Sequence, residues 1–81
     1  MKTVYLSLGS NISDREAMLQ SAIEALPGAG VEVLRTSSLY ETEPQDVRNQ
    51  PWFLNMAAEC RTDLFPVQLL GRLKKIEVQL V

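Results

Sequence analysis

The chain has 81 residues, of which 46% are hydrophobic and 22% charged, and its formal net charge is −2. This length allows a single domain (residues 1–81), and the composition is that of a globular protein rather than a disordered one. The chain has no histidine and one cysteine, Cys60, which excludes Ser–His or Cys–His catalysis, an intrachain disulfide and a zinc site built on imidazole. The acidic balance argues against nucleic acid as a partner. No apolar run reaches the ~20 residues of a membrane helix, so we expect a soluble, cytoplasmic α+β domain.

The first part of the chain predicts a strand followed by a helix. Residues Thr3–Leu8 alternate between polar and apolar side chains, as in a strand with one buried face. Ser13 and Glu16 have the spacing of a capping box, which opens a helix, and Pro27-Gly28 ends it. The apolar stripe of this helix consists of Met18, Leu19, Ala22, Ile23 and Leu26.

The middle of the chain predicts two strands joined by a long loop. The second strand covers Val31–Thr42, and its broken alternation at Leu34-Arg35 predicts a bulge. The connection Glu43–Pro51 holds two prolines and almost no apolar residue, so we expect a mobile loop with a function. In the third strand, Trp52–Thr62, one face is apolar throughout and the other is mixed. The apolar face consists of Leu54, Met56, Ala58 and Cys60, and the other of Phe53, Asn55, Ala57, Glu59 and Arg61.

The last part of the chain predicts a second helix. Pro66 suits its first turn, and its buried stripe consists of Leu69, Leu70, Leu73, Ile76 and Leu80. The sequence stops at Val81 within this pattern, without a glycine, a proline or a basic cap, as a cut chain would.

Two segments have residue types that suit a ligand, and each also has a purely structural explanation. Phe53 and Asn55 share the polar face of the third strand, where a flat ring beside an amide suits a planar, polar heterocycle. The alternative is a half-exposed sheet face with nothing bound. At Thr42-Glu43-Pro44 the proline favours an extended backbone whose peptide groups are free to contact a ligand, or the segment simply ends the strand.

Other candidates have a simpler interpretation. Gly9-Ser10-Asn11 precedes a helix, as anion sites do, but it lacks a phosphate-binding glycine pattern and is interpreted as a plain turn. Lys74 and Glu77 have the spacing of a solvated ion pair on a helix. Cys60 lies on the apolar face of its strand and is predicted to be a core residue.

Three segments, in matching order and spacing, resemble the hydroxymethyl-dihydropterin pyrophosphokinase family: Val4–Asn11, Ser37–Pro44 and Gln50–Asn55. The resemblance covers nearly the whole chain. It implies an ATP-dependent enzyme of folate biosynthesis that transfers diphosphate to 6-hydroxymethyl-7,8-dihydropterin with the help of Mg²⁺. Its partners would be the dihydropterin and ATP.

Residue by residue, the resemblance assigns roles to two groups of side chains. The dihydropterin would be bound by Thr42, Pro44, Gln45, Phe53 and Asn55, and ATP by Glu77 and Lys74. Family members are longer than this chain, and the resemblance implies that the Mg²⁺ ligands and the catalytic groups lie beyond Val81. The chain would then be the N-terminal half of the enzyme, with no catalytic or metal-binding residue of its own, and inactive alone.

The family architecture implies a ferredoxin-like α+β fold, an antiparallel sheet in the strand order 4-1-3-2 with two helices on one face. This chain would hold β-α-β-β-α and lack the fourth strand. The first strand, Thr3–Leu8, would then be an unpaired edge, so we expect dimerisation through it, pairing with a detached C-terminal fragment, or aggregation. A different function stays open, which is a non-catalytic ligand-binding or oligomerisation module with the same fold.

Overall fold

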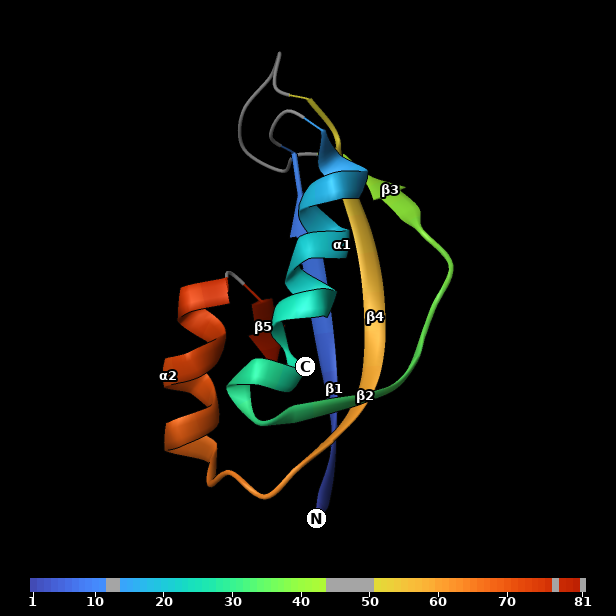
Figure 1. Ribbon diagram of the computed structural model, residues 1–81. Helices are drawn as coiled ribbons and strands as arrows, with labels where there is room; N and C mark the ends of the chain where they lie inside the picture. Colours follow the sequence, from blue (N-terminus) through green and yellow to red (C-terminus); the bar gives the residue numbers. More distant parts are fainter. Residues whose placement is uncertain (12–13, 44–50, 77, 81) are drawn as a thin grey trace.

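The structure is a computed structural model that describes residues 1–11, 14–43 and 51–76 and the backbone of residues 78–80. It contains two α-helices and five strands (Figure 1). In chain order the elements are β1 (Lys2–Ser10), α1 (Arg15–Ala25), the 3-10 helix η1 (Pro27–Ala29), β2 (Val31–Thr36), β3 (Tyr40–Thr42), β4 (Phe53–Thr62), α2 (Pro66–Ile76) and β5 (Val78–Leu80).

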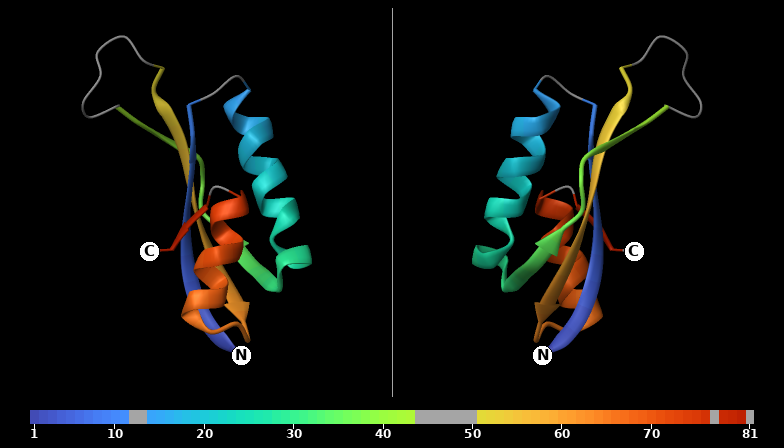
Figure 2. Two further views of the ribbon diagram at one scale, coloured as in Figure 1. Left: turned by 90° about the vertical axis from the view of Figure 1, so that its left-hand side faces the viewer. Right: turned by 90° about the vertical axis from the view of Figure 1, so that its right-hand side faces the viewer.

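The strands form one antiparallel sheet in the order β2-β4-β1-β5, and β3 pairs with β4 beyond the end of β2. Both helices lie on the same side of this sheet (Figure 2). The predicted α+β class, with an antiparallel sheet and two helices on one face, is therefore confirmed. Of the helices that the structure describes, none has the length and apolar character needed to span a membrane. The cytoplasmic location stays a prediction.

The hydrophobic core lies between the sheet and the helices. β1 and β4 pair without interruption from Lys2↔Thr62 to Ser10↔Leu54, so their apolar side chains point to the helices together. Cys60 is fully buried there, and burial raises the pKa of its thiol, as fits the predicted core role. The buried hydrophobic residues are Leu6, Leu8, Leu19, Leu26, Val31, Met56, Ala58, Cys60, Leu69 and Leu73.

The second predicted strand is divided in two. β2 ends at Thr36 and β3 begins at Tyr40. The pairing of β2 with β4 shifts register between Val33 and Arg35, which confirms the predicted bulge. An extra residue in a strand bends it, and the chain leaves the sheet soon afterwards before it returns as β3.

The start of α1 and the end of β1 differ from the predictions. The N-cap is Asp14, whose carboxylate accepts a hydrogen bond from the Ala17 amide at 3.1 Å, whereas the predicted capping box placed the cap at Ser13, outside the described residues. β1 continues to Ser10, so Gly9 belongs to a strand and not to a turn.

The predicted end of the second helix is wrong. α2 begins at Pro66 as expected but stops at Ile76, and β5 follows. Leu80 therefore belongs to a strand. Leu70 is 45% exposed, so it does not belong to the buried stripe either.

The predicted absence of a fourth strand is also wrong. β5 pairs antiparallel with β1, from Leu6↔Leu80 to Leu8↔Val78. The backbone groups on the open side of β1 need hydrogen-bond partners, and a short strand that folds back beside them provides these partners. β1 is thus an inner strand over Leu6–Leu8 and not the unpaired edge that the sequence predicted.

Candidate functional site

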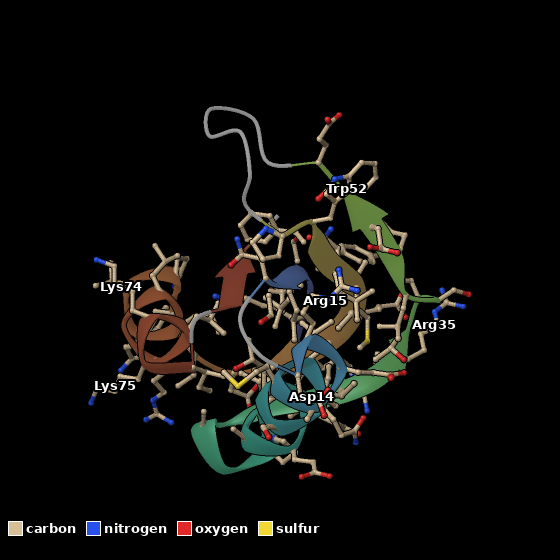
Figure 3. The ribbon with its side chains drawn as sticks, turned by 90° about the horizontal axis from the view of Figure 1, so that it is seen from above. Asp14, Arg15, Arg35, Trp52, Lys74 and Lys75 are labelled. Carbon is tan, nitrogen blue, oxygen red and sulfur yellow. The ribbon has the colours of Figure 1, made fainter. Side chains whose placement is uncertain are left out.

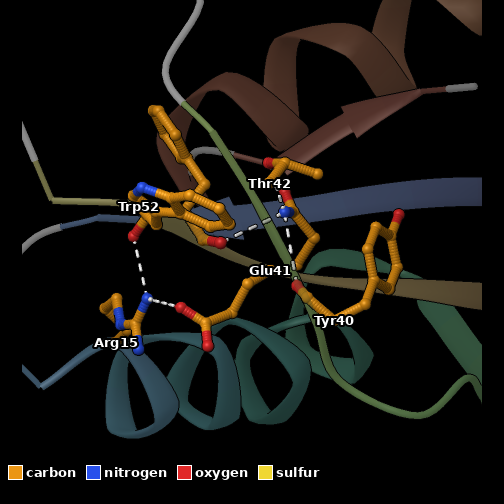
Figure 4. A network of polar contacts seen from close by, with 7 residues as sticks. Arg15, Tyr40, Glu41, Thr42 and Trp52 are labelled. Carbon is orange, nitrogen blue, oxygen red and sulfur yellow. Dashed lines mark hydrogen bonds and ion pairs between the residues drawn. The ribbon is translucent and has the colours of Figure 1, made fainter. Parts of the chain in front are cut away.

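Four side chains from β3 and β4 lie on the face of the sheet away from the helices. The register pairs Tyr40 with Asn55 and Thr42 with Phe53, and directly opposite residues of an antiparallel pair share a face. The Asn55 amide nitrogen donates to the Thr42 hydroxyl at 2.8 Å and to the main-chain carbonyls of Tyr40 and Phe53, each at 3.4 Å (Figure 4). These contacts hold the amide with its nitrogen toward β3.

Gly9 leaves space on the other side of Asn55. It pairs with Asn55 across β1 and β4, and a Cβ at this position would lie 2.8 Å from Asn55 Oδ1 and 3.7 Å from Phe53 Cδ1. Any other residue at position 9 would therefore crowd the amide oxygen. With glycine there, Asn55 Oδ1 stays free of a side chain from β1.

A small cavity of about 160 Å³ begins beside Phe53 at this end of the sheet. It runs between the end of β1 and the helices, so it lies on the helix side of the sheet and not on the face of Asn55. Its lining also includes Leu8, Gly9, Ser10, Asn11, Met18, Leu19, Ala22 and Ile76. Drug-sized ligands usually occupy ~300–1,000 Å³, so this cavity suits a small molecule or one part of a larger one. A wider hollow of about 740 Å³ lies at the opposite end of β4, beside Val31 and Leu64 and away from Asn55.

Arg15 connects the helix side of the sheet to the same two strands. Its Nη1 donates to the Glu41 carboxylate at 3.0 Å and to the Trp52 carbonyl oxygen at 2.8 Å (Figure 4). Glu41 and Trp52 are the chain neighbours of Thr42 and Phe53. The Trp52 side chain itself is 49% exposed.

A second polar network lies further along the open face. The Tyr5 hydroxyl and Arg35 both donate to Glu59 Oε1, at 3.2 and 3.1 Å. The hydrogen bond from Arg35 is the main cause that lowers the pKa of Glu59, and the bond from Tyr5 acts in the same direction while burial opposes both. The same contact raises the pKa of Arg35.

The structure brings together three of the predicted site residues, Thr42, Phe53 and Asn55. It does not bring Lys74 to them, because Lys74 is exposed in the last turn of α2 and points away from α1 (Figure 3). Pro44, Gln45 and Glu77 lie outside the described residues, and their assignments stay predictions. Within the described ranges, no three Asp, Glu, Cys or His side chains lie close enough to hold a metal ion.

Sequence reasoning missed Gly9 and Arg15, although each gives a local signal. A glycine inside a strand often marks a close approach of another group, and Gly9 continues the alternation of β1. An arginine in the first turn of a helix is unfavourable next to the positive end of the helix dipole. Arg15 in that position therefore indicates a specific partner elsewhere.

The comparisons with known proteins agree along almost the whole chain. The family model of 7,8-dihydro-6-hydroxymethylpterin-pyrophosphokinase (HPPK) matches residues 5–81. The 2-amino-4-hydroxy-6-hydroxymethyldihydropteridine pyrophosphokinase of Bacillus subtilis strain 168 is 47% identical over 77 residues, which cover 94% of this chain and 46% of the relative. The protein of the same name from Aquifex aeolicus strain VF5 is 42% identical, with 95% and 48% covered.

A plant relative matches the same region as part of a larger protein. The mitochondrial folate synthesis bifunctional protein of Pisum sativum is 43% identical over 91% of this chain, which corresponds to 14% of the relative. The chain spans about half the length of the two bacterial relatives. On this match and these identities, the chain belongs to the 7,8-dihydro-6-hydroxymethylpterin-pyrophosphokinase family.

Proposed function

We propose that the chain supplies the dihydropterin-binding part of an enzyme that transfers diphosphate from ATP to 6-hydroxymethyl-7,8-dihydropterin in folate biosynthesis. Family membership supports the reaction class. The observation that carries the assignment of the site is the geometry of Asn55, whose amide nitrogen is held by Thr42 while its oxygen faces the space at Gly9.

This geometry suits the edge of a pterin ring. The name of the bacterial relatives describes a pteridine with a 2-amino and a 4-hydroxy substituent, which is a flat ring with donors and acceptors along one edge. Asn55 Oδ1 would accept a hydrogen bond from a ring donor, since the amide nitrogen is already engaged. Phe53 would provide an apolar surface on which the ring stacks. Pro44 and Gln45 would complete the pocket.

ATP and Mg²⁺ are proposed as co-substrate and metal ion. Diphosphate transfer depends on positioning the phosphates and on neutralising their charge with metal ions and cations. The described residues include no cluster of metal-binding side chains, so we assign no step through Mg²⁺ to them. Glu77 and Lys74 stay as proposed contacts of ATP, and the catalytic groups are proposed to lie beyond Val81. Alone, the 81-residue chain would bind a pterin without releasing AMP.

Within the α+β class, we propose that the sheet and helices have a ferredoxin-like arrangement. It is supported by the order β2-β4-β1-β5, which reproduces the strand order 4-1-3-2 when β4 and β5 are counted as the third and fourth strands. The short β3 is an addition at the end of β4. In this arrangement the proposed pterin site lies on the sheet face opposite the helices.

The test is the affinity of the intact protein for a pterin, measured by calorimetric titration. Asn55→Ala should weaken binding by ~1–3 kcal/mol because a buried ring donor loses its acceptor. Gln20→Ala is the matched control, since it removes an exposed amide from α1 that contacts Glu24. Unchanged affinity in Asn55→Ala would remove Asn55 from the site. Failure of an enzyme of the relatives' full length that carries these 81 residues to release AMP from ATP and 6-hydroxymethyl-7,8-dihydropterin would overturn the function, whereas the 81-residue chain alone should release none.

A further inference from the structure

Arg15 occupies a position that helix electrostatics disfavours and that two specific acceptors offset. It is the first residue of α1, where the helix dipole repels a cation. Its Nη1 donates to one charged acceptor, Glu41 Oε2, and to one main-chain acceptor, the carbonyl oxygen of Trp52. An exposed ion pair alone contributes little to stability. The second hydrogen bond, to the Trp52 carbonyl oxygen, lets the same guanidinium group connect β3 to the start of β4.

One acceptor lies in β3 and the other is the residue directly before β4, and these two strands carry the proposed pterin site. Glu41 precedes Thr42 in β3, and Trp52 precedes Phe53 at the start of β4. Glu41 pairs with Leu54, which packs against the core, so Glu41 lies on the helix side of the sheet. The side chains of Thr42 and Phe53 lie on the opposite face. The Arg15 guanidinium group therefore binds β3 and the residue before β4 from the helix side of the sheet, opposite the face of the proposed site.

β3 needs such a link because little else holds it. It has three residues, all exposed, and it pairs only with β4 in the part of the chain that the structure describes. Its place relative to β4 sets the 2.8 Å hydrogen bond between Asn55 Nδ2 and Thr42 Oγ1. If β3 moved, Asn55 would lose the contact that fixes the direction of its oxygen.

We propose that Arg15 is a positioning residue of the pterin site, which acts through Glu41 and Trp52 to keep Thr42 beside Asn55. The inference rests on the proposed function for its ligand. Arg15 itself contacts neither the ring nor the phosphates. Its effect is transmitted by the backbone of β3 and of the first residues of β4.

The experiment compares variants of the intact protein by calorimetric titration with 6-hydroxymethylpterin and by the NMR signals of the Asn55 side-chain amide. Arg15→Ala should weaken binding about fivefold, the loss expected when one neutral hydrogen bond of a site is loosened, and should shift the Asn55 amide signals. Arg15→Lys keeps a positive charge and hydrogen-bond donors. It should restore most of the pterin affinity and return the Asn55 amide signals most of the way to their original positions. Glu41→Gln should change the pterin affinity and the Asn55 amide signals in the same direction as Arg15→Ala. It tests the contact between Arg15 and Glu41 even if Arg15→Ala does not fold.

Arg61→Ala is the matched control, because it removes an exposed ion pair of the same kind, Arg61 to Glu32 at 3.1 Å, that lies away from the site. It should leave binding and the Asn55 signals unchanged. The positioning role would be overturned if Arg15→Ala bound the pterin as tightly as the unsubstituted protein, or if Arg61→Ala lost as much affinity as Arg15→Ala. Either result would leave the proposed function in place. If the unsubstituted protein binds no pterin, the proposed function fails, and this inference fails with it.

Discussion

The missing side chain at Gly9 leaves room for the oxygen of the Asn55 amide. A Cβ at Gly9 would come within 2.8 Å of Asn55 Oδ1, so the amide would have to turn. We expect Gly9→Ala to weaken pterin binding by ~1–2 kcal/mol through this displaced acceptor. The free energy of unfolding should change by only about 0.5 kcal/mol, because the crowded atom is the end of a side chain.

Calorimetric titration and denaturant unfolding of the intact protein separate these two effects. Gly28→Ala is the control, because a Cβ at Gly28 meets no atom within 4 Å. Equal pterin affinities for the two alanine variants would contradict the role of Gly9.

Glu59 gives the fold a dependence on pH. Its carboxylate accepts hydrogen bonds from Arg35 and Tyr5, which lower its pKa in the folded chain from the ordinary 4.5. A carboxyl group with a lowered pKa stabilises the folded state above its unfolded pKa, and this contribution is lost as the pH falls through the folded pKa. Between about pH 5 and pH 3, the chain should therefore lose more unfolding free energy than Glu59→Gln does.

Urea unfolding at a series of pH values measures this difference. Arg35→Ala removes the main cause of the lowered pKa, so its pH dependence should approach that of Glu59→Gln. If all three proteins lose stability in parallel, the network around Glu59 has no part in the acid response.

At the level of single elements, alternation predicted β4 well, but it did not predict the division of the second strand into β2 and β3 or the end of α2. Alternation over residues 52–62 predicts β4 to within one residue, and it separates the face of Asn55 from the core face. The bulge at Val33 and Arg35 is likewise visible as a local break in the pattern. These features depend on which side of one strand is buried, which a sequence displays directly.

The end of α2 depends on a distant strand. An apolar residue at each of positions 73, 76 and 80 fits a helical stripe, but Val78 and Leu80 also fit the alternation of a strand. The chain adopts the strand because β1 provides a row of backbone partners there. Similarly, Asp14 and Ser13 are both good N-cap residues, and only the fold shows that Asp14 caps α1.

The candidate site was predictable where it follows one strand and unpredictable where it joins several elements. Phe53 and Asn55 lie two residues apart in one strand, so the alternation of the sequence already places them on one face. Gly9 and Arg15 contact residues far along the chain, and periodicity does not reveal such contacts. The role of Lys74 stays a prediction, since it came from the resemblance, and the structure shows only that its side chain is exposed on α2.

For the molecule as a whole, β5 decides whether β1 has a free edge. β1 has nine residues, and β5 covers Leu6–Leu8 on the side away from β4. α2 lies next to β5. Without β5, the backbone N–H and C=O groups of Leu6–Leu8 that point away from β4 would have no partner strand.

We therefore expect a version of the 81-residue chain that lacks residues 77–81 to associate more strongly than the complete chain. Leu6–Leu8 would then have no partner on one side, and pairing with a second copy is the simplest way to satisfy the exposed backbone groups. Sedimentation of both chains at matched micromolar concentrations should give a larger average mass for the shortened one. Removal of Val81 alone is the control, since it leaves Val78–Leu80 in place. Equal masses for all three chains would show that the pairing of β5 with β1 does not protect this edge.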